Sequence, residues 1–475
     1  MIIRLLIICF VFEIWSSTLI AQIPNPVHAG SIIRINGQAE INGAQSVFVQ
    51  GNYAYVTGYS STRLEIIDIS NPTNPIHKSN ITAGNNPKAV QISGNYAYVI
   101  DNFSDRFFVF DISNKSNPVL KATINTDISN GIYLVDPTDL FISGNYIYIL
   151  DSGHGKLTIF DISNPLVPVH KSSVSIGSSP RSIHIQGNYA YIGSNKSFQI
   201  LDITNSTTPS SIASISDSGF GDTIIDPLAV QVSGDYAYLL NGSIYRSGNI
   251  IGCSLEILDV SNPYNISYKG KIIDGDGGSL LNYPSSISIV GNYAYITSQS
   301  SNALEIIDIS NSSSPTHKTS IVNGANGALL NSPRKVFISG NYAYVASAGS
   351  NAMEVIDLFT PPSPNASTAT SIGQTSFVAN WNATTNATSY KIEVSSDNFS
   401  TFVTGYNGSS QSATSVIVTG LSPATNYKYR IRGINTYSAS STNSNIINVV
   451  TIPGTPTATS PTNISQTGFT VNWNT

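Results

Sequence analysis

This chain of 475 residues has few charged residues and almost no cysteine. Only 10% of its residues are charged, and its formal net charge is −5. A protein that binds nucleic acid needs a basic face to neutralise phosphates, so the composition argues against nucleic acid as a partner. The two cysteines are Cys9, near the start of the chain, and Cys253. If Cys9 is removed with a signal peptide, Cys253 has no partner for an intrachain disulfide.

Motifs for catalysis and metal binding are also missing. The chain has no Ser-His-Asp order, no His-Glu-x-x-His motif and no glycine-rich phosphate loop. The run DGDGG at 274–278 begins like a calcium loop, but Ser285 stands where the closing Glu belongs. We therefore expect no catalytic residues, no metal and no cofactor.

What the chain does have is a repeat. The pattern Gly-Asn-Tyr, followed by Asp-Ile-Ser, recurs with small variations at intervals of 43 to 57 residues. The repeated glycines are Gly51, Gly94, Gly144, Gly187, Gly234, Gly291 and Gly340, and the matching aspartates are Asp68, Asp111, Asp161, Asp202, Asp259, Asp308 and Asp357. A period of this length with several short strands per unit is typical of a β-propeller blade. The sequence predicts an all-β protein with a seven-bladed propeller.

Each unit divides into four strands. In one copy we expect an inner strand around Val90, a second strand at 96–100, a third at 107–112 and a fourth at 119–124. Gly and Asn suit the hairpin turn between the first two strands. Each repeated aspartate precedes a turn, where its carboxylate can accept backbone N–H bonds, so we interpret these aspartates as structural.

The two ends of the repeat region complement each other. The last unit ends at 353–359 without a fourth strand, while the N-terminal NPVHAGSIIRI resembles the start of fourth strands such as NPIHKSNI. We expect residues 28–35 to pair with the third strand of the last blade, near 353–358. This closure would remove an open sheet edge.

The repeats resemble the LVIVD family, a group of propeller-forming repeats in extracellular and periplasmic bacterial proteins. The resemblance rests on LEIIDIS, FFVFDIS, LTIFDIS, FQILDIT, LEILDVS and MEVIDLF and covers residues 25–359, with 25–36 closing the last blade. The fifth unit departs from the pattern, because 25 residues rather than 17 separate Gly234 from Asp259. The resemblance implies a fold and says little about activity.

The C-terminal part resembles fibronectin type III modules. After a linker at 360–364, residues 365–452 contain Trp381 in FVANW, together with Leu421 and Tyr427 in the spacing of that family's tyrosine corner. The resemblance implies a β-sandwich. Residues 455–475 match the beginning of the same module through Trp473, so we expect the truncated start of a second copy.

Residues 1–21 have the pattern of a secretory signal peptide. Arg4 precedes an apolar run at 5–12, and small residues end at Ala21. The apolar run is too short to cross a bilayer, so we expect no membrane span in the mature chain. The alternative is a membrane anchor. The signal pattern predicts a protein that is secreted or held at the cell surface.

Loops that differ between blades mark the face where we expect binding. Five of these loops carry one cation each: Arg63, Arg106, Lys156, Lys196 and Arg246. Three further cations follow a proline at the start of an inner strand and would surround the mouth of the central channel: Lys88, Arg181 and Arg334. Together they could receive an acidic glycan or a partner's carboxylates. The alternative is that they only keep the loops soluble.

A catalytic alternative would require two carboxylates near the channel mouth. Asp101 and Asp151, at equivalent positions in neighbouring loops, are the obvious pair, and His154 lies close to Asp151 in sequence.

We favour a monomeric, non-catalytic interaction or adhesion scaffold that binds an extracellular protein or an acidic glycan. A secreted protein that binds or processes glycans at the channel mouth is the alternative.

Overall fold

The computed structural model describes residues 23–33, 41–216, 226–246, 249–435 and 441–474. The expected signal peptide at 1–21 lies outside these residues. Within the described residues the chain forms β-strands and three short 3-10 helices, η1 (Ile128–Asn130), η2 (Asp276–Gly278) and η3 (Ala325–Gly327). Two compact units are present. One is Pro24–Leu358, and the other includes Phe359–Thr475.

Seven four-stranded antiparallel sheets make up the described part of Pro24–Leu358. The inner strands are β2 (Ala44–Gln50), β6 (Pro87–Ser93), β10 (Pro137–Ser143), β14 (Pro180–Gln186), β18 (Pro227–Ser233), β22 (Pro284–Val290) and β26 (Pro333–Ser339). The second strands are β3 (Tyr53–Gly58), β7 (Tyr96–Asp101), β11 (Tyr146–Asp151), β15 (Tyr189–Ser194), β19 (Tyr236–Arg246), β23 (Tyr293–Ser298) and β27 (Tyr342–Ser347).

The third strands are β4 (Arg63–Asp68), β8 (Arg106–Asp111), β12 (Lys156–Asp161), β16 (Ser197–Asp202), β20 (Asn249–Asp259), β24 (Ala303–Asp308) and β28 (Ala352–Asp357). The fourth, outermost strands are β5 (Ile76–Thr82), β9 (Val119–Asn125), β13 (Val169–Ser175), β17 (Ser210–Ser216), β21 (Ser267–Ile273), β25 (Thr316–Val322) and the N-terminal β1 (Val27–Ile33). The longer spacing in the fifth unit appears as longer strands, because β19 and β20 have 11 residues each.

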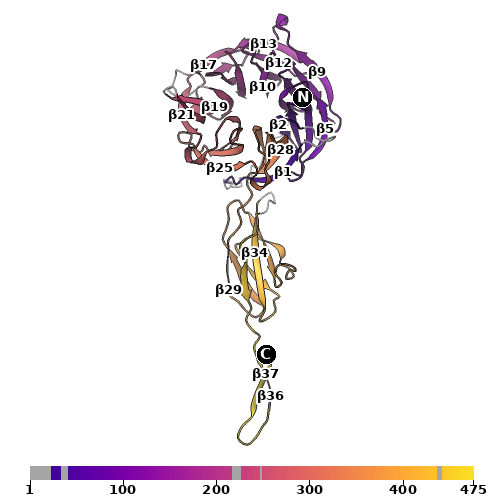
Figure 1. Cartoon of the computed structure of the whole chain (residues 1–475), viewed down its shortest axis with the longest axis vertical. Helices are drawn as coiled ribbons and strands as arrows, with labels where there is room; N and C mark the ends of the chain where they lie inside the picture. Colours follow the sequence, from indigo (N-terminus) through magenta and orange to yellow (C-terminus); the bar gives the residue numbers. More distant parts are fainter. Residues whose placement is uncertain (1–22, 34–40, 217–225, 247–248, 436–440, 475) are drawn as a thin grey trace, which may run out of the picture. The chain divides into compact units, whose positions relative to one another are not determined.

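The inner strands form a closed ring. Each contacts the next along the chain, from β2 through β6, β10, β14, β18 and β22 to β26, and β26 contacts β2. Figure 1 shows the sheets arranged around a central opening in this order. This arrangement is a β-propeller, as the repeat predicts.

The ring closes through the N-terminal strand. β1 pairs antiparallel with β28, from Val27 opposite Asp357 to Ile33 opposite Ala352. The expected strand included residues 34 and 35, which lie outside the described residues. Because β1 completes a sheet whose other three strands come from the end of the propeller, the first and last parts of this unit fold as one body.

The core lies between neighbouring sheets. One cluster of buried side chains joins Tyr55 and Leu64 of one sheet to Val90 and Ala97 of the next. Each sheet therefore buries both faces against its neighbours, which accounts for the nearly continuous apolar runs in the second and third strands.

The repeated turns have the local chemistry that their residues predict. All seven turn glycines have φ between 56 and 59°, a conformation that side chains other than Gly rarely adopt. At the second type of turn, the Oδ1 atom of Asp111 accepts the N–H of Ser113 at 3.0 Å. The same bond from residue i+2 occurs at Asp68, Asp161, Asp202, Asp259 and Asp308. After Asp357 the residue at i+2 is Phe359 rather than Ser or Thr.

The second unit contains a β-sandwich. One sheet has β29 (Ala366–Thr370), β30 (Ser376–Trp381) and β33 (Ser415–Thr419). The other has β32 (Asn407–Gln411), β31 (Ser389–Ser395), β34 (Asn426–Ile434) and β35 (Ile447–Val450). Trp381 and Tyr390 pack edge to face in the core, with ring centroids 5.7 Å apart. The hydroxyl oxygen of Tyr427 accepts the N–H of Ser422 at 2.9 Å, as a tyrosine corner requires.

A separate hairpin follows the sandwich. It consists of β36 (Thr457–Thr462) and β37 (Thr470–Asn474). Trp473 corresponds in sequence to the buried Trp381, but its side chain is 61% exposed in the hairpin. Two strands alone cannot enclose a core, which explains this exposure.

Candidate binding site at the mouth of the propeller channel

A β-bulge at the start of every inner strand shapes the mouth of the channel. In each of the seven, the pairing register shifts after the first residue, which is Pro in six strands and Ala44 in β2. A bulge bends the strand and redirects the side chain at the extra residue. Lys88, Arg181 and Arg334 are the second residues of β6, β14 and β26, so the bulge decides where these cations point.

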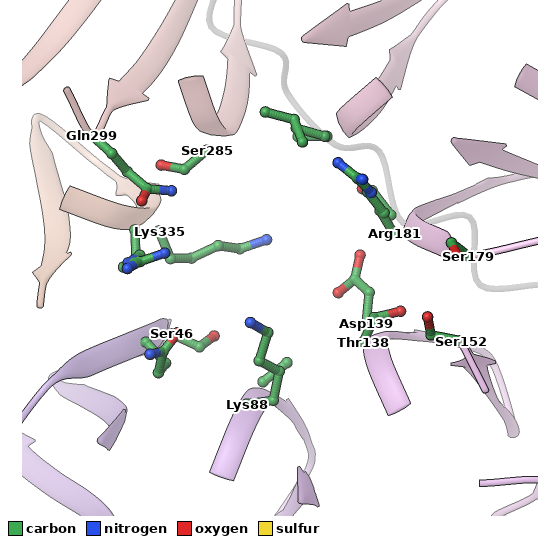
Figure 2. A pocket seen from close by; sticks show the side chains of 16 residues that line it. Ser46, Lys88, Thr138, Asp139, Ser152, Ser179, Arg181, Ser285, Gln299 and Lys335 are labelled. Carbon is green, nitrogen blue, oxygen red and sulfur yellow. The ribbon is translucent and has the colours of Figure 1, made fainter. Parts of the chain in front are cut away.

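These three cations, which the sequence predicts around the channel mouth, line one cavity. Its volume is about 450 Å³, and most of its lining is polar. Lys335 and Asp139, the third residues of β26 and β10, also line it. Figure 2 shows Lys88, Asp139, Arg181 and Lys335 pointing into the opening from different strands. Among the described residues that line the cavity, four cations therefore face one carboxylate.

The positive charges of Lys88 and Arg334 are only partly balanced by neighbouring negative groups. Burial, and next the neighbouring Arg334 guanidinium, lower the pKa of the Lys88 amine. Burial also lowers the pKa of Arg334. The Nε atom of Arg334 is buried and has no hydrogen-bond partner among the described residues. An anion in the cavity would satisfy that donor and offset the repulsion between these two positive charges.

Two carboxylates near the cavity, those of Asp226 and Asp139, already have partners within the chain. Asp226 makes a 2.8 Å ion pair with Nη1 of Arg181. The Oδ1 atom of Asp139 accepts the N–H of Leu140, and its Oδ2 atom accepts the N–H of Ile183, so Asp139 ties β10 to β14. Burial raises the pKa of Asp139. The positive charge of Lys88, Arg334 and Lys335 is therefore only partly compensated from within the chain.

A second cavity of about 490 Å³ adjoins the first deeper in the channel. The two share the third residues of five inner strands: Ser46, Asp139, Ser182, Ala229 and Lys335. The fifth residues of the inner strands line only the deeper cavity: Phe48, Gln91, Phe141, His184, Gln231, Ser288 and Phe337. The channel thus has a cationic mouth and a partly aromatic layer beneath it.

The loop cations do not gather at this site. Arg63 donates to the Oδ1 atom of Asn80, and Arg106 donates to the carbonyl of Ser104. Lys156 donates to Ser175 and lies 5.1 Å from the centre of the Tyr133 ring. Lys196 is exposed, and the side chain of Arg246 lies outside the described residues. None of the four described cations lines the mouth cavity.

Asp101, Asp151 and His154 likewise lie outside the lining of the mouth cavity. The buried carboxylate of Asp101 accepts the N–H groups of Asn85, Asn86 and Phe103 at 2.8 to 3.1 Å. Asp151 accepts the N–H of His154 at 2.9 Å and lies 3.2 Å from its Nδ1 atom. These carboxylates hold loops, so they do not provide the pair at the mouth that the catalytic alternative required.

The two aspartates of DGDGG also accept hydrogen bonds from backbone N–H groups. Asp274 accepts the N–H of Leu281, and Asp276 accepts the N–H of Ile273. Across the described ranges, no group of three or more His, Cys, Asp or Glu residues is arranged to hold a metal ion. In the same ranges, no helix is long and apolar enough to cross a membrane.

Comparison with known families agrees with the repeat pattern and the sheets. Six segments match the LVIVD repeat, namely residues 43–83, 85–126, 136–175, 177–217, 283–322 and 332–369. The chain belongs to the LVIVD-repeat family. The fifth unit, with its long β19 and β20, falls in the gap between the matched segments. Residues 361–450 match the fibronectin type III domain.

Solved structures support the propeller fold of this LVIVD-repeat protein. The periplasmic gluconolactonase PpgL of Pseudomonas aeruginosa is 12% identical, with a TM-score of 0.50 over 64% of this chain and 97% of its own. A protein from Lactobacillus plantarum is also 12% identical, with a TM-score of 0.51 over 63% of this chain and 96% of its own. At such low identity the likeness concerns the fold alone. No curated protein matches the chain in sequence.

Proposed function

We propose that this LVIVD-repeat protein is a non-catalytic extracellular interaction scaffold whose propeller binds an anionic ligand at the mouth of its channel. The observation that carries the proposal is the cluster of Lys88, Arg181, Arg334 and Lys335 around one cavity, with a buried Arg334 donor that has no partner among the described residues. A cavity of this volume suits part of a ligand or one acidic group of a larger partner.

Secretion is part of the proposal. It is supported by the signal-peptide pattern at 1–21 and by the fibronectin type III domain, a module typical of extracellular proteins. We also propose that the chain acts as a monomer, since each sheet of the propeller is completed within the chain.

The number of carboxylates at the channel mouth favours ligand binding over hydrolysis of a glycan. Hydrolysis of a glycosidic bond normally uses two carboxyl groups on either side of the bond. Of the described residues that line the mouth cavity, Asp139 alone is acidic, and both of its oxygens accept backbone N–H bonds. The cations at the mouth could bind either an acidic glycan or a carboxylate of a partner protein.

The test replaces cations with residues that other inner strands carry at the same position. Gln45, Ser285 and Thr138 occupy the second position in β2, β22 and β10. The variant therefore combines Lys88→Gln, Arg181→Ser and Arg334→Thr, and the matched control combines Arg63→Ala with Lys196→Ala. Binding of citrate, sulfate and trigalacturonate would be measured by calorimetry at low and high salt.

We expect the parent and the loop-cation control to bind at least one of these anions with an affinity that falls as salt rises. The triple variant should bind at least tenfold more weakly and respond less to salt. Thermal unfolding would show whether it is folded. The proposal is overturned if the parent binds none of the three anions, or if the folded triple variant binds as well as the parent.

A further inference from the structure

The fifth residue of each inner strand forms an aromatic and amide layer below the cationic mouth. Four of the seven side chains in this layer are aromatic, namely Phe48, Phe141, His184 and Phe337. All four are only partly buried, so each presents a face to the channel. Aromatic surface left in contact with solvent inside a channel is unfavourable unless something covers it.

The aromatic side chains form two pairs. Phe48 and Phe337 have ring centroids 4.7 Å apart, and Phe141 and His184 have ring centroids 4.9 Å apart. The first pair comes from β2 and β26, and the second from β10 and β14. Only β6 separates the pairs on one side of the ring of inner strands, and β18 and β22 separate them on the other. The two pairs therefore face each other across the channel.

The two glutamine side chains of this layer, Gln91 and Gln231, already form hydrogen bonds within the protein. The side chain of Gln91 donates to the carbonyl of Leu140 and accepts the N–H of Ile142. Gln231 accepts the N–H of Ile289. Burial lowers the pKa of His184 to about 4, with a smaller effect from Lys335, so its ring is neutral near pH 7. This layer therefore contributes no charged side chain near pH 7, and its apolar surface comes from the two aromatic pairs.

From these two layers we propose that the channel binds a small organic anion with a flat apolar ring. Its acidic group pairs with Lys88, Arg334 and Lys335 at the mouth, and its ring enters between the Phe48–Phe337 and Phe141–His184 pairs. This inference rests on the proposed function, because it takes the mouth as the anion site. It adds that the apolar ring of the ligand lies beneath its acidic group.

The spacing of the two layers supports this ligand class. Lys335 and Phe337 belong to one strand and lie two residues apart, which is about 7 Å along the strand. That distance is comparable to the separation between the carboxylate and the far ring of a bicyclic aromatic acid.

The probe is 2-naphthoate, compared with acetate, which lacks the ring, and with 2-naphthalenemethanol, which lacks the charge. Two variants test the contributions of the aromatic layer and the cationic mouth separately. Phe48→Gln with Phe337→Gln introduces the residue that β6 and β18 carry at the fifth position, and Lys335→Ser introduces the residue that β2 and β22 carry at the third. Ser288→Ala, in the same layer but without a ring, is the control, and thermal unfolding verifies that each variant folds.

We expect the parent and the control to bind 2-naphthoate at least tenfold more tightly than either comparison compound. The double Phe variant should lose most of this advantage and still bind citrate or sulfate like the parent. Lys335→Ser should weaken 2-naphthoate binding and leave 2-naphthalenemethanol unaffected. If the double variant does not fold, Phe141→Gln tests the opposite pair.

The inference is overturned if 2-naphthoate binds no better than acetate, or if the alcohol binds as well as the acid. It is also overturned if folded variants of both aromatic pairs bind 2-naphthoate like the parent. Binding of citrate or sulfate in the same experiment would leave the proposed anion site standing in each case. A parent that binds none of these anions would refute both proposals.

Discussion

The Nδ1 atom of His28 lies 2.5 Å from Oε1 of Glu354, although 326 residues separate the two in the chain. His28 belongs to the closing strand β1, and Glu354 belongs to its partner β28. The Glu354 side chain is fully buried, and its Oε2 atom accepts the N–H of Leu329 in the loop after η3. The pair therefore joins the closing strand, the last sheet and an adjoining loop at one point.

We predict that removing this pair destabilises the propeller. His28→Ala removes the ion-pair partner of the buried Glu354 carboxylate and leaves it the Leu329 amide, and an unsatisfied buried polar group costs about 1–3 kcal/mol. The melting temperature of the propeller transition should fall by several degrees, and deletion of residues 25–36 should lower it further because it exposes the edge of β28.

A matched control is available in another sheet. His170 occupies the same position on β13 but contacts the hydroxyl of Ser173 instead of a buried glutamate. His170→Ala should therefore lower the melting temperature less than His28→Ala. Equal effects would show that the buried carboxylate adds nothing, and an unchanged melting temperature after the deletion would refute the closure argument.

A second prediction concerns Glu256 on β20. Burial raises the pKa of its carboxyl group from 4.5 to about 8, and Lys271 opposes this only in part. Between those two pH values the folded chain holds a proton that the unfolded chain has released. The contribution of Glu256 to stability is therefore complete below pH 4.5 and is lost as the pH rises through 8, by about 1.4 kcal/mol per pH unit inside that window.

Glu256→Gln removes this dependence, and β16 already carries Gln199 at the equivalent position. We expect the variant to melt at a higher temperature than the parent at pH 8, with a difference that shrinks toward pH 5. The reciprocal change, Gln199→Glu, should introduce a loss of stability with rising pH. Thermal unfolding from pH 5 to pH 9 measures both, and parallel curves for parent and variants would contradict the assignment.

Much of the propeller could be predicted because its signals are local. A turn glycine such as Gly94 is required by a positive φ, and an aspartate such as Asp111 binds an amide only two residues away. The closing strand was also predictable, because the Pro-apolar-His pattern around His28 repeats that of other fourth strands. The prolines before Lys88, Arg181 and Arg334 placed these cations at the channel mouth for the same reason.

The rest of the site depends on contacts between units. Lys335 was missed because the bulge at Arg334 lets two consecutive residues line the cavity, and the sequence does not show which residue of a strand bulges. Asp139 was missed because it acts through an amide on the next inner strand. The sequence predicts Asp101 as a candidate at the mouth, yet its carboxylate accepts the N–H groups of Asn85 and Asn86 in the loop before β6.

A third prediction is that Cys253 reacts slowly in the folded protein. Its side chain is 8% exposed, and its Sγ atom lies 2.9 Å from the carbonyl oxygen of Gly242. Burial raises the pKa of the thiol, which lowers the fraction of reactive thiolate. Labelling with a disulfide reagent should be at least 100-fold slower than in denaturant, and non-reducing electrophoresis should show monomers. Rapid labelling of native protein, or an obligatory covalent dimer, would contradict this.

The last prediction separates a structural from a ligand-binding role for Asp101. Its buried carboxylate accepts three backbone N–H bonds at 2.8 to 3.1 Å, and Gly84 approaches so closely that a Cβ atom there would lie 2.0 Å from Oδ2. Asp101→Asn keeps the shape but replaces one acceptor oxygen with a donor, which opposes the amides of the loop. We expect a loss of about 1–3 kcal/mol in the free energy of unfolding.

Anion binding at the channel mouth should be unchanged in Asp101→Asn, because Asp101 does not line the cavity. The control is Asp111→Asn in an exposed turn, where a change of no more than about 0.5 kcal/mol is expected. Denaturant unfolding and calorimetry with citrate would be run on the same preparations. If Asp101→Asn kept parental stability but lost citrate binding, the carboxylate would belong to the binding site, and the assignment of Asp101 to loop anchoring would be wrong.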